Sequence, residues 1–162
     1  MSSRTYKRIE LAEHQLETAI GLFVSGGDRF SVISLAGAAD VILCRLVLNM
    51  GQENFTETML KEAIAEGEEN ATIQYIGRCI NDTLFINDLK HMDEGDDGNL
   101  DIDIEVCAIA AILKALANYV MLAGRDKSFV QAFLAWVQLN LDPKVYNICC
   151  DPNWKLSERG HR

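Results

Sequence analysis

Apolar side chains recur along most of the chain at steps of three and four residues, which is the spacing of one face of an α-helix. Over residues 6–24, Ile9, Leu16 and Phe23 lie on one face while charged residues hold the other. Similar patterns predict further helices over residues 29–50, 56–67, 70–91, 102–123 and 128–141. No segment alternates apolar and polar residues over a sustained run. The sequence therefore predicts an all-α, single-domain bundle of five to six helices.

Two of these helices carry features that bear on function. The helix over 29–50 is apolar nearly all round, and its LAGAA segment, Leu35 to Ala39, has small side chains that let a neighbouring helix approach closely. The helix over 70–91 carries a stripe that is apolar at first and turns polar at its C-terminal end. The stripe consists of Ile73, Ile76, Ile80, Leu84, Asn87 and His91. Thr56 is predicted to be the N-cap of the short helix between them.

The predicted domain covers residues 4–142. Residues 143–162 form a C-terminal tail, for which we expect one short helical turn at most. At 162 residues, with 49% apolar side chains and two prolines, the chain has the composition of a helical globular domain. Its formal charge of −9 disfavours non-specific binding to nucleic acid, because such binding needs a basic surface.

The five cysteines form no C-x-x-C pair, and three of them lie inside apolar helical patterns. That usage indicates a reducing compartment. The N-terminus has no apolar core of the kind a secretory signal needs. The most apolar helix, over 102–123, is interrupted by Lys114 and Asn118 and is a poor membrane span. We therefore expect a cytoplasmic protein with no membrane partner and no cofactor.

The acidic segment after residue 92 is the first candidate for chemistry. If Gly98 is aligned with the glycine of a calcium-binding EF-hand loop, Asp93, Asp97 and Asp101 take its first, fifth and ninth positions. Gly95 then stands at the third ligand position and Ile104 at that of the bidentate glutamate. We therefore interpret the segment as a solvated linker, whose last acids favour the N-terminus of the next helix.

The polar end of the helix over 70–91 is the second candidate. Asn87 and His91 are four residues apart and share a helix face, with Asp88 and Lys90 beside it. The alternative is a structural helix end, at which Lys90 and His91 satisfy the last carbonyl groups.

At this point the chain resembles bacterial members of the HEPN superfamily. The resemblance rests on AEHQLETAIGLF near the N-terminus, SLAGAADVIL, the NDLKH segment, the acidic linker and ILKALANYVML, and it covers residues 4–140. It implies a helical bundle that dimerises with the histidine-bearing helix ends facing each other. It also implies, for active members, a metal-independent endoribonuclease with an arginine, a polar residue directly after it, and a histidine.

Carried onto this chain, His91 matches the histidine and Asn87 the polar residue, but Ile86 stands where the arginine belongs. In that chemistry the histidine moves protons and the arginine stabilises charge on the phosphate. Lys90 offers only a point charge in its place. We therefore expect the fold of the family but not its nuclease activity.

Three polar residues in apolar surroundings complete the set of candidates. Asp40 lies within the apolar AGAADVIL segment and needs a partner, for which Arg45, Lys90 and His91 are candidates. We expect an ion pair or an exposed helix edge there. Asn118 and Tyr119 are predicted core hydrogen bonders beneath the His91 site.

These observations leave three hypotheses. The first is a non-catalytic or weakly catalytic HEPN-like dimeric module that binds a partner protein or a nucleotide. The second is a metal-independent endoribonuclease of toxin or RNA-processing type that uses His91, Asn87 and Lys90, with RNA disfavoured as a ligand by the acidic charge. The third is divalent-cation binding by the loop over residues 93–105. We favour the first.

Overall fold

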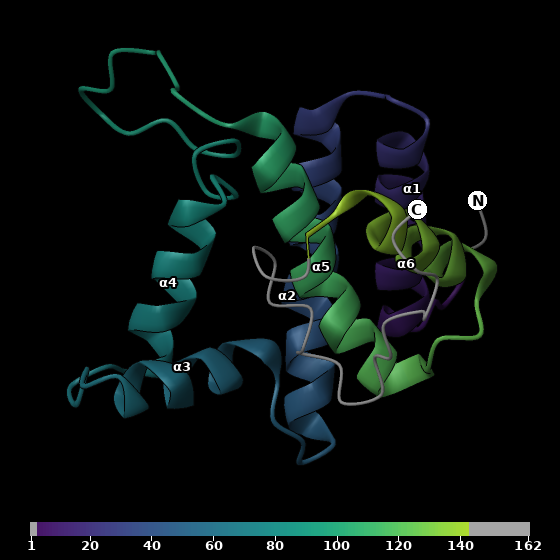
Figure 1. Cartoon of the computed structure of the whole chain (residues 1–162), viewed down its shortest axis with the longest axis horizontal. Coiled ribbons are helices and arrows are strands. Elements are labelled where there is room, and N and C mark those ends of the chain that lie inside the picture. Colours follow the sequence, from purple (N-terminus) through teal and green to yellow (C-terminus); the bar gives the residue numbers. More distant parts are fainter. Residues whose placement is uncertain (1–2, 143–162) are drawn as a thin grey trace.

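The computed structural model describes residues 3–142 of the chain. Within that range every regular element is helical, so the all-α prediction is confirmed. The predicted tail over 143–162, with Cys149 and Cys150, lies outside the described residues. The helices are α1 (Arg8–Val24), α2 (Arg29–Asn49), α3 (Phe55–Ala65), α4 (Ile73–Thr83), α5 (Ile104–Ala123) and α6 (Ser128–Asn140) (Figure 1).

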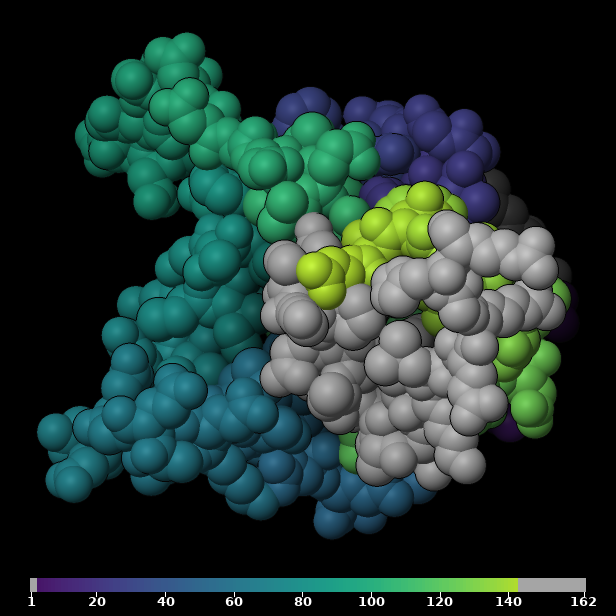
Figure 2. Space-filling view, in the orientation of Figure 1, coloured from purple at the N-terminus to yellow at the C-terminus, as the bar shows by residue number. Residues whose placement is uncertain are grey.

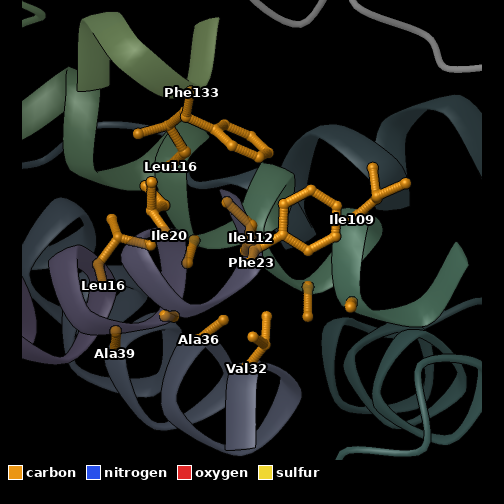
Figure 3. Close-up of a cluster of buried hydrophobic side chains, with 14 of the residues drawn as sticks. Leu16, Ile20, Phe23, Val32, Ala36, Ala39, Ile109, Ile112, Leu116 and Phe133 are labelled. Carbon is orange, nitrogen blue, oxygen red and sulfur yellow. The ribbon is translucent and has the colours of Figure 1, made fainter. Parts of the chain in front are cut away.

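Four of these helices share one hydrophobic core. α2 packs most extensively against α5 and α1, and α6 covers α1. Figure 3 shows side chains from all four meeting, with Phe23 of α1 between α5 and α6. The ring of Phe23 lies edge-on to Phe133 and Trp136, with centroids 6.0 Å and 4.8 Å away. Such edge-to-face pairs add to the stabilisation from burial alone.

Small residues on α2 make close packing possible, as the sequence predicted. Ala36 and Ala39 are fully buried. At Gly37, however, the close neighbour is not a helix but the side chain of Ile86. A Cβ atom added to Gly37 would lie 2.8 Å from its Cγ2 atom. The segment after α4 therefore packs directly onto α2.

α3 and α4, with the turn between them, form an arm beside the four-helix core (Figure 1). We use "the arm" for residues 55–83. Its two helices pack mainly on each other, and each buries a single side chain, Thr56 in α3 and Ile76 in α4. Asn54, not Thr56, is the N-cap of α3. Its side chain accepts a hydrogen bond from the Glu57 N–H, and the Glu57 carboxylate accepts one from the Asn54 N–H.

α2 and α5 are each long and apolar enough to cross a membrane by length and composition alone. Both contribute buried side chains to the core of the bundle. Because a core helix of a globular domain passes the same test, this property is weak evidence for a membrane span.

Candidate functional site

The NDLKH segment does not lie on a helix as predicted. α4 ends at Thr83, eight residues before His91. Residues 84–90 form consecutive turns, and Phe85 has a positive φ of 56°, a left-handed conformation that does not continue the helix. The N–H of Ile86 reaches back to the Asn81 carbonyl at 2.9 Å. The predicted helix over 70–91 is therefore wrong at its C-terminal end.

The cause of this early end is the burial of two apolar residues. Leu84 is 8% exposed and Ile86 is 2% exposed, and both belong to the core cluster. In a continuous helix two residues that are two positions apart point about 200° apart, so one of them would face away from the core. The turn at Phe85 lets both enter it. The position at which the family resemblance places an arginine is thus a core position.

The polar residues of this segment point outward and do not converge. Asn87 donates a hydrogen bond from Nδ2 to Oδ1 of Asp82 at 3.1 Å. Asp88, Lys90 and His91 are exposed. Within residues 3–142, the His91 side chain has no hydrogen-bond or ion-pair partner. A hollow on the described surface lies at the turn between α3 and α4, and none of the candidate residues lines it.

A buried polar cluster lies elsewhere, between α2 and α5. Lys114 forms an ion pair with Oδ2 of Asp40, and the two side chains are 6% and 5% exposed. Asn118 donates from Nδ2 to Oδ1 of Asp40 at 2.8 Å. Lys114 also donates to Oδ1 of Asn81 on α4 at 3.2 Å. The expected ion pair of Asp40 therefore exists, but its partner is not one of the three predicted.

The neighbouring helices explain the difference. Arg45, Lys90 and His91 are all exposed, whereas α5 packs closely on α2. Lys114 and Asn118 are four residues apart and therefore lie on the same face of α5. That spacing of two polar residues within an apolar helix was the signal in the sequence that could have identified them as partners of Asp40.

The cluster continues to the start of α3. The Oδ1 atom of Asn118 accepts a hydrogen bond from the Phe55 N–H at 3.0 Å. Asn54, which is 1% exposed, donates from Nδ2 to the Cys44 Sγ at 2.8 Å. Burial, reinforced by the nearby Asp40 carboxylate, raises the pKa of the Cys44 thiol. A raised pKa favours the protonated thiol over the thiolate, which is the nucleophilic form of cysteine.

Tyr119 points to a different neighbour from the one predicted. Its hydroxyl donates to the Oε2 atom of Glu13 on α1, and Lys127 pairs with Oε1 of the same carboxylate at 3.0 Å. The hydrogen bond from Tyr119 lowers the pKa of Glu13, and burial together with Glu13 raises the pKa of Tyr119. Neither Asn118 nor Tyr119 contacts His91, so the predicted support beneath that residue is absent from the described structure.

The acidic linker stands away from the helices (Figure 2). Asp93, Asp97 and Asp101 are exposed, and within residues 3–142 no three histidine, cysteine or acidic side chains are close enough to hold a metal ion. Oδ1 of Asp97 accepts from the Asn99 N–H at 2.9 Å, and this bond lowers its pKa. At the end of the linker Asp103 caps α5 by accepting from the Val106 N–H at 3.2 Å, as expected for acids before a helix.

Comparison with known proteins adds no relative. No protein-family model, curated protein or solved structure matches this chain. The resemblance to the HEPN superfamily therefore stays a prediction.

Proposed function

We propose that the chain is a non-catalytic, HEPN-like helical module that acts as a homodimer and binds a partner protein or a nucleotide. The observation that carries this proposal is the burial of Ile86. An arginine at this position would have its guanidinium group among apolar side chains next to Gly37. Loss of a phosphate-stabilising group of this kind typically removes roughly 3 to 4 kcal/mol of transition-state stabilisation.

The surroundings of His91 support the same proposal. A catalytic base is commonly held in position by a second group. His91 is exposed directly after the turns over 84–90, and no side chain of the described residues hydrogen-bonds to it. The net charge of −9 also works against the binding of an RNA substrate.

Exposed apolar side chains on α2 support the association part of the proposal. Phe30 and Val41 are 47% and 61% exposed. They are eleven residues apart, which is close to three full turns, so they lie on the same face of the helix. Ser34 and Gly37 lie between them, so they are two separate apolar side chains on one helix face, each exposed enough to contact another chain.

The test of the catalytic part is RNA cleavage by the purified full chain in EDTA, beside His91→Ala and a matched His14→Ala control. His14 is an exposed histidine on α1. We expect no cleavage by any of the three proteins. Cleavage by the wild type and by His14→Ala that is lost in His91→Ala would contradict the proposal and support the endoribonuclease.

The test of the association part is sedimentation of the wild type, Val41→Lys and a Leu139→Lys control. Leu139 on α6 is 84% exposed, so its substitution adds the same charge on another surface. We expect a dimer for the wild type and the control, and a monomer for Val41→Lys. A wild-type monomer at every concentration would refute the dimer. A calcium-dependent rise in its thermal midpoint would instead support cation binding by the loop over 93–105.

A further inference from the structure

The arm buries much less apolar surface than the helices it covers. Thr56 and Ile76 are the buried side chains of α3 and α4, whereas ten residues of α5 are buried. Burial of apolar surface is the main source of stability against local opening. α3 and α4 are therefore the helices of the described fold that the hydrophobic effect holds least.

The arm nevertheless covers the most polar part of the interior. Asn81, near the end of α4, accepts a hydrogen bond from Lys114 at 3.2 Å. At the other end of the arm, the Phe55 N–H donates to Asn118 at 3.0 Å. Both hydrogen bonds lead directly to the Asp40–Lys114 ion pair. The pair is thus enclosed by α2 and α5 on one side and by the two ends of the arm on the other.

Hydration of this ion pair favours an open arm. Enclosing two charges costs several kcal/mol per ion in desolvation, which their attraction offsets only in part. A solvent-exposed ion pair stabilises a protein by only about 0 to 1 kcal/mol, but hydration of its two charges removes the desolvation cost. Water that enters beneath a lifted arm therefore compensates for the hydrogen bonds to α5 that opening breaks, at Asn81, at Phe55 and at the Thr83 carbonyl.

Firm attachments flank the arm on both sides. Asn54, just before it, is 1% exposed and holds Cys44 through its side-chain amide. Leu84 and Ile86, just after it, are inserted into the core. Asn54, Leu84 and Ile86 lie outside residues 55–83, and the hydrogen bond from the Ile86 N–H to the Asn81 carbonyl places the second hinge at the end of α4, so the arm can lift without separating α2 from α5.

We propose that the arm is a cover that opens as one unit, while the rest of the described bundle stays folded, and that its opening exposes the Asp40–Lys114 pair to solvent. This proposal does not depend on the function proposed above.

Amide hydrogen exchange on the full chain tests the opening. In the wild type we expect arm amides to exchange at least a hundredfold faster than the buried amides of α5, with one common denaturant dependence across the arm that is weaker than that of the α5 amides. Ile76→Ala should speed arm exchange at least tenfold and leave α5 exchange little changed. Val130→Ala, a matched deletion of a fully buried side chain in α6, should speed α5 exchange and leave arm exchange unchanged.

Acylation of Lys114, followed by peptide mass mapping, tests whether opening exposes the ion pair. We expect labelling by an amine-specific reagent to rise in Ile76→Ala by the same factor as arm exchange, and to be unchanged in Val130→Ala. Equal exchange rates and equal denaturant dependence in the arm and α5 would overturn the proposal. The proposal would also be overturned if Lys114 were labelled only at the rate at which the whole domain unfolds. If Ile76→Ala does not fold, Ile76→Val replaces it, and the expected increases in arm exchange and in Lys114 labelling are smaller.

Discussion

Removal of the positive charge at Lys114 should destabilise the protein strongly, and it should do so in a pH-dependent way. In Lys114→Met the carboxylate of Asp40 keeps its hydrogen bond from Asn118 but loses its counter-ion inside the fold. Breaking a buried pair by removing one partner typically costs about 3 to 5 kcal/mol. For a domain of this size, a loss of about 3 kcal/mol lowers the Tm by roughly 6 to 12 °C.

Protonation sets an upper limit to this loss. An isolated buried carboxylate can take up a proton instead of remaining charged, and at pH 7 protonation of an ordinary aspartate costs about 4 kcal/mol. Each unit by which the pH is lowered reduces that cost by about 1.4 kcal/mol. The stability deficit of Lys114→Met relative to the wild type should therefore be largest near pH 7 and shrink toward pH 5.

Urea unfolding followed by helical circular dichroism at pH 5, 6 and 7 measures both effects. The double variant Asp40→Asn with Lys114→Met removes both charges and keeps an acceptor for Asn118, so it should lie within about 2 kcal/mol of the wild type. Lys61→Met breaks an ion pair with Glu53 whose side chains are 70% and 35% exposed, and it should cost less than about 1 kcal/mol. A loss of this small size in Lys114→Met, with no pH dependence, would show that the Asp40 pair is solvated.

Two further predictions concern the packing of the turn and the acid side chain of α1. Gly37→Ala should cost about 1 to 2 kcal/mol, because its Cβ would lie 2.8 Å from Ile86 and overpacking outweighs the gain in helix propensity. The destabilisation by Gly37→Ala should disappear when Ile86→Ala is also present, and urea unfolding midpoints measure the effect of Gly37→Ala in each background. Glu13→Gln should lower stability by about 1 kcal/mol at pH 7. The hydrogen bond from Tyr119 lowers the folded pKa of Glu13 below its ordinary value of 4.5, so its contribution is present above that pH and lost as the pH falls through the lowered pKa. The variant should therefore show a shallower loss of stability between pH 5 and 3 than the wild type, and parallel curves would contradict this reasoning.

The arrangement of helices was largely predictable from apolar periodicity, but the end of α4 was not. A stripe from Ile73 to Leu84 continues at helical spacing through Asn87 and His91, which favoured a helix of six turns. Ile86 does not lie on that stripe. It is buried against Gly37, and the chain leaves the helix to allow this packing. Apolar periodicity identifies the residues on one face of a helix. It does not show whether an apolar residue outside that face will also be buried, and in this segment that burial determines where the helix ends.

The partner of Asp40 was only partly predictable, because the spacing of Lys114 and Asn118 marks a polar face of one helix but not the helix on which that face packs. The sequence showed that a carboxylate in an apolar segment needs a partner, and the ion pair is present. Lys114 is 74 residues away along the chain. Its selection follows from the packing of α2 on α5, which no local pattern specifies. Lys114 had stood out in the sequence only because it interrupts an apolar run.

Asn81 connects the two sites that the sequence and the structure bring forward. Its carbonyl accepts the N–H of Ile86 at 2.9 Å, and its side chain accepts a hydrogen bond from Lys114 at 3.2 Å. The turn that buries Ile86 therefore also fixes the residue that completes the hydrogen bonding of the Lys114 ammonium group. A side chain of another size or charge at position 86 would move Asn81 and leave one donor of Lys114 without its acceptor, in an interior where an unpaired donor is costly. The burial of Ile86 and the hydrogen bond from Lys114 to Asn81 thus both depend on the conformation of this turn.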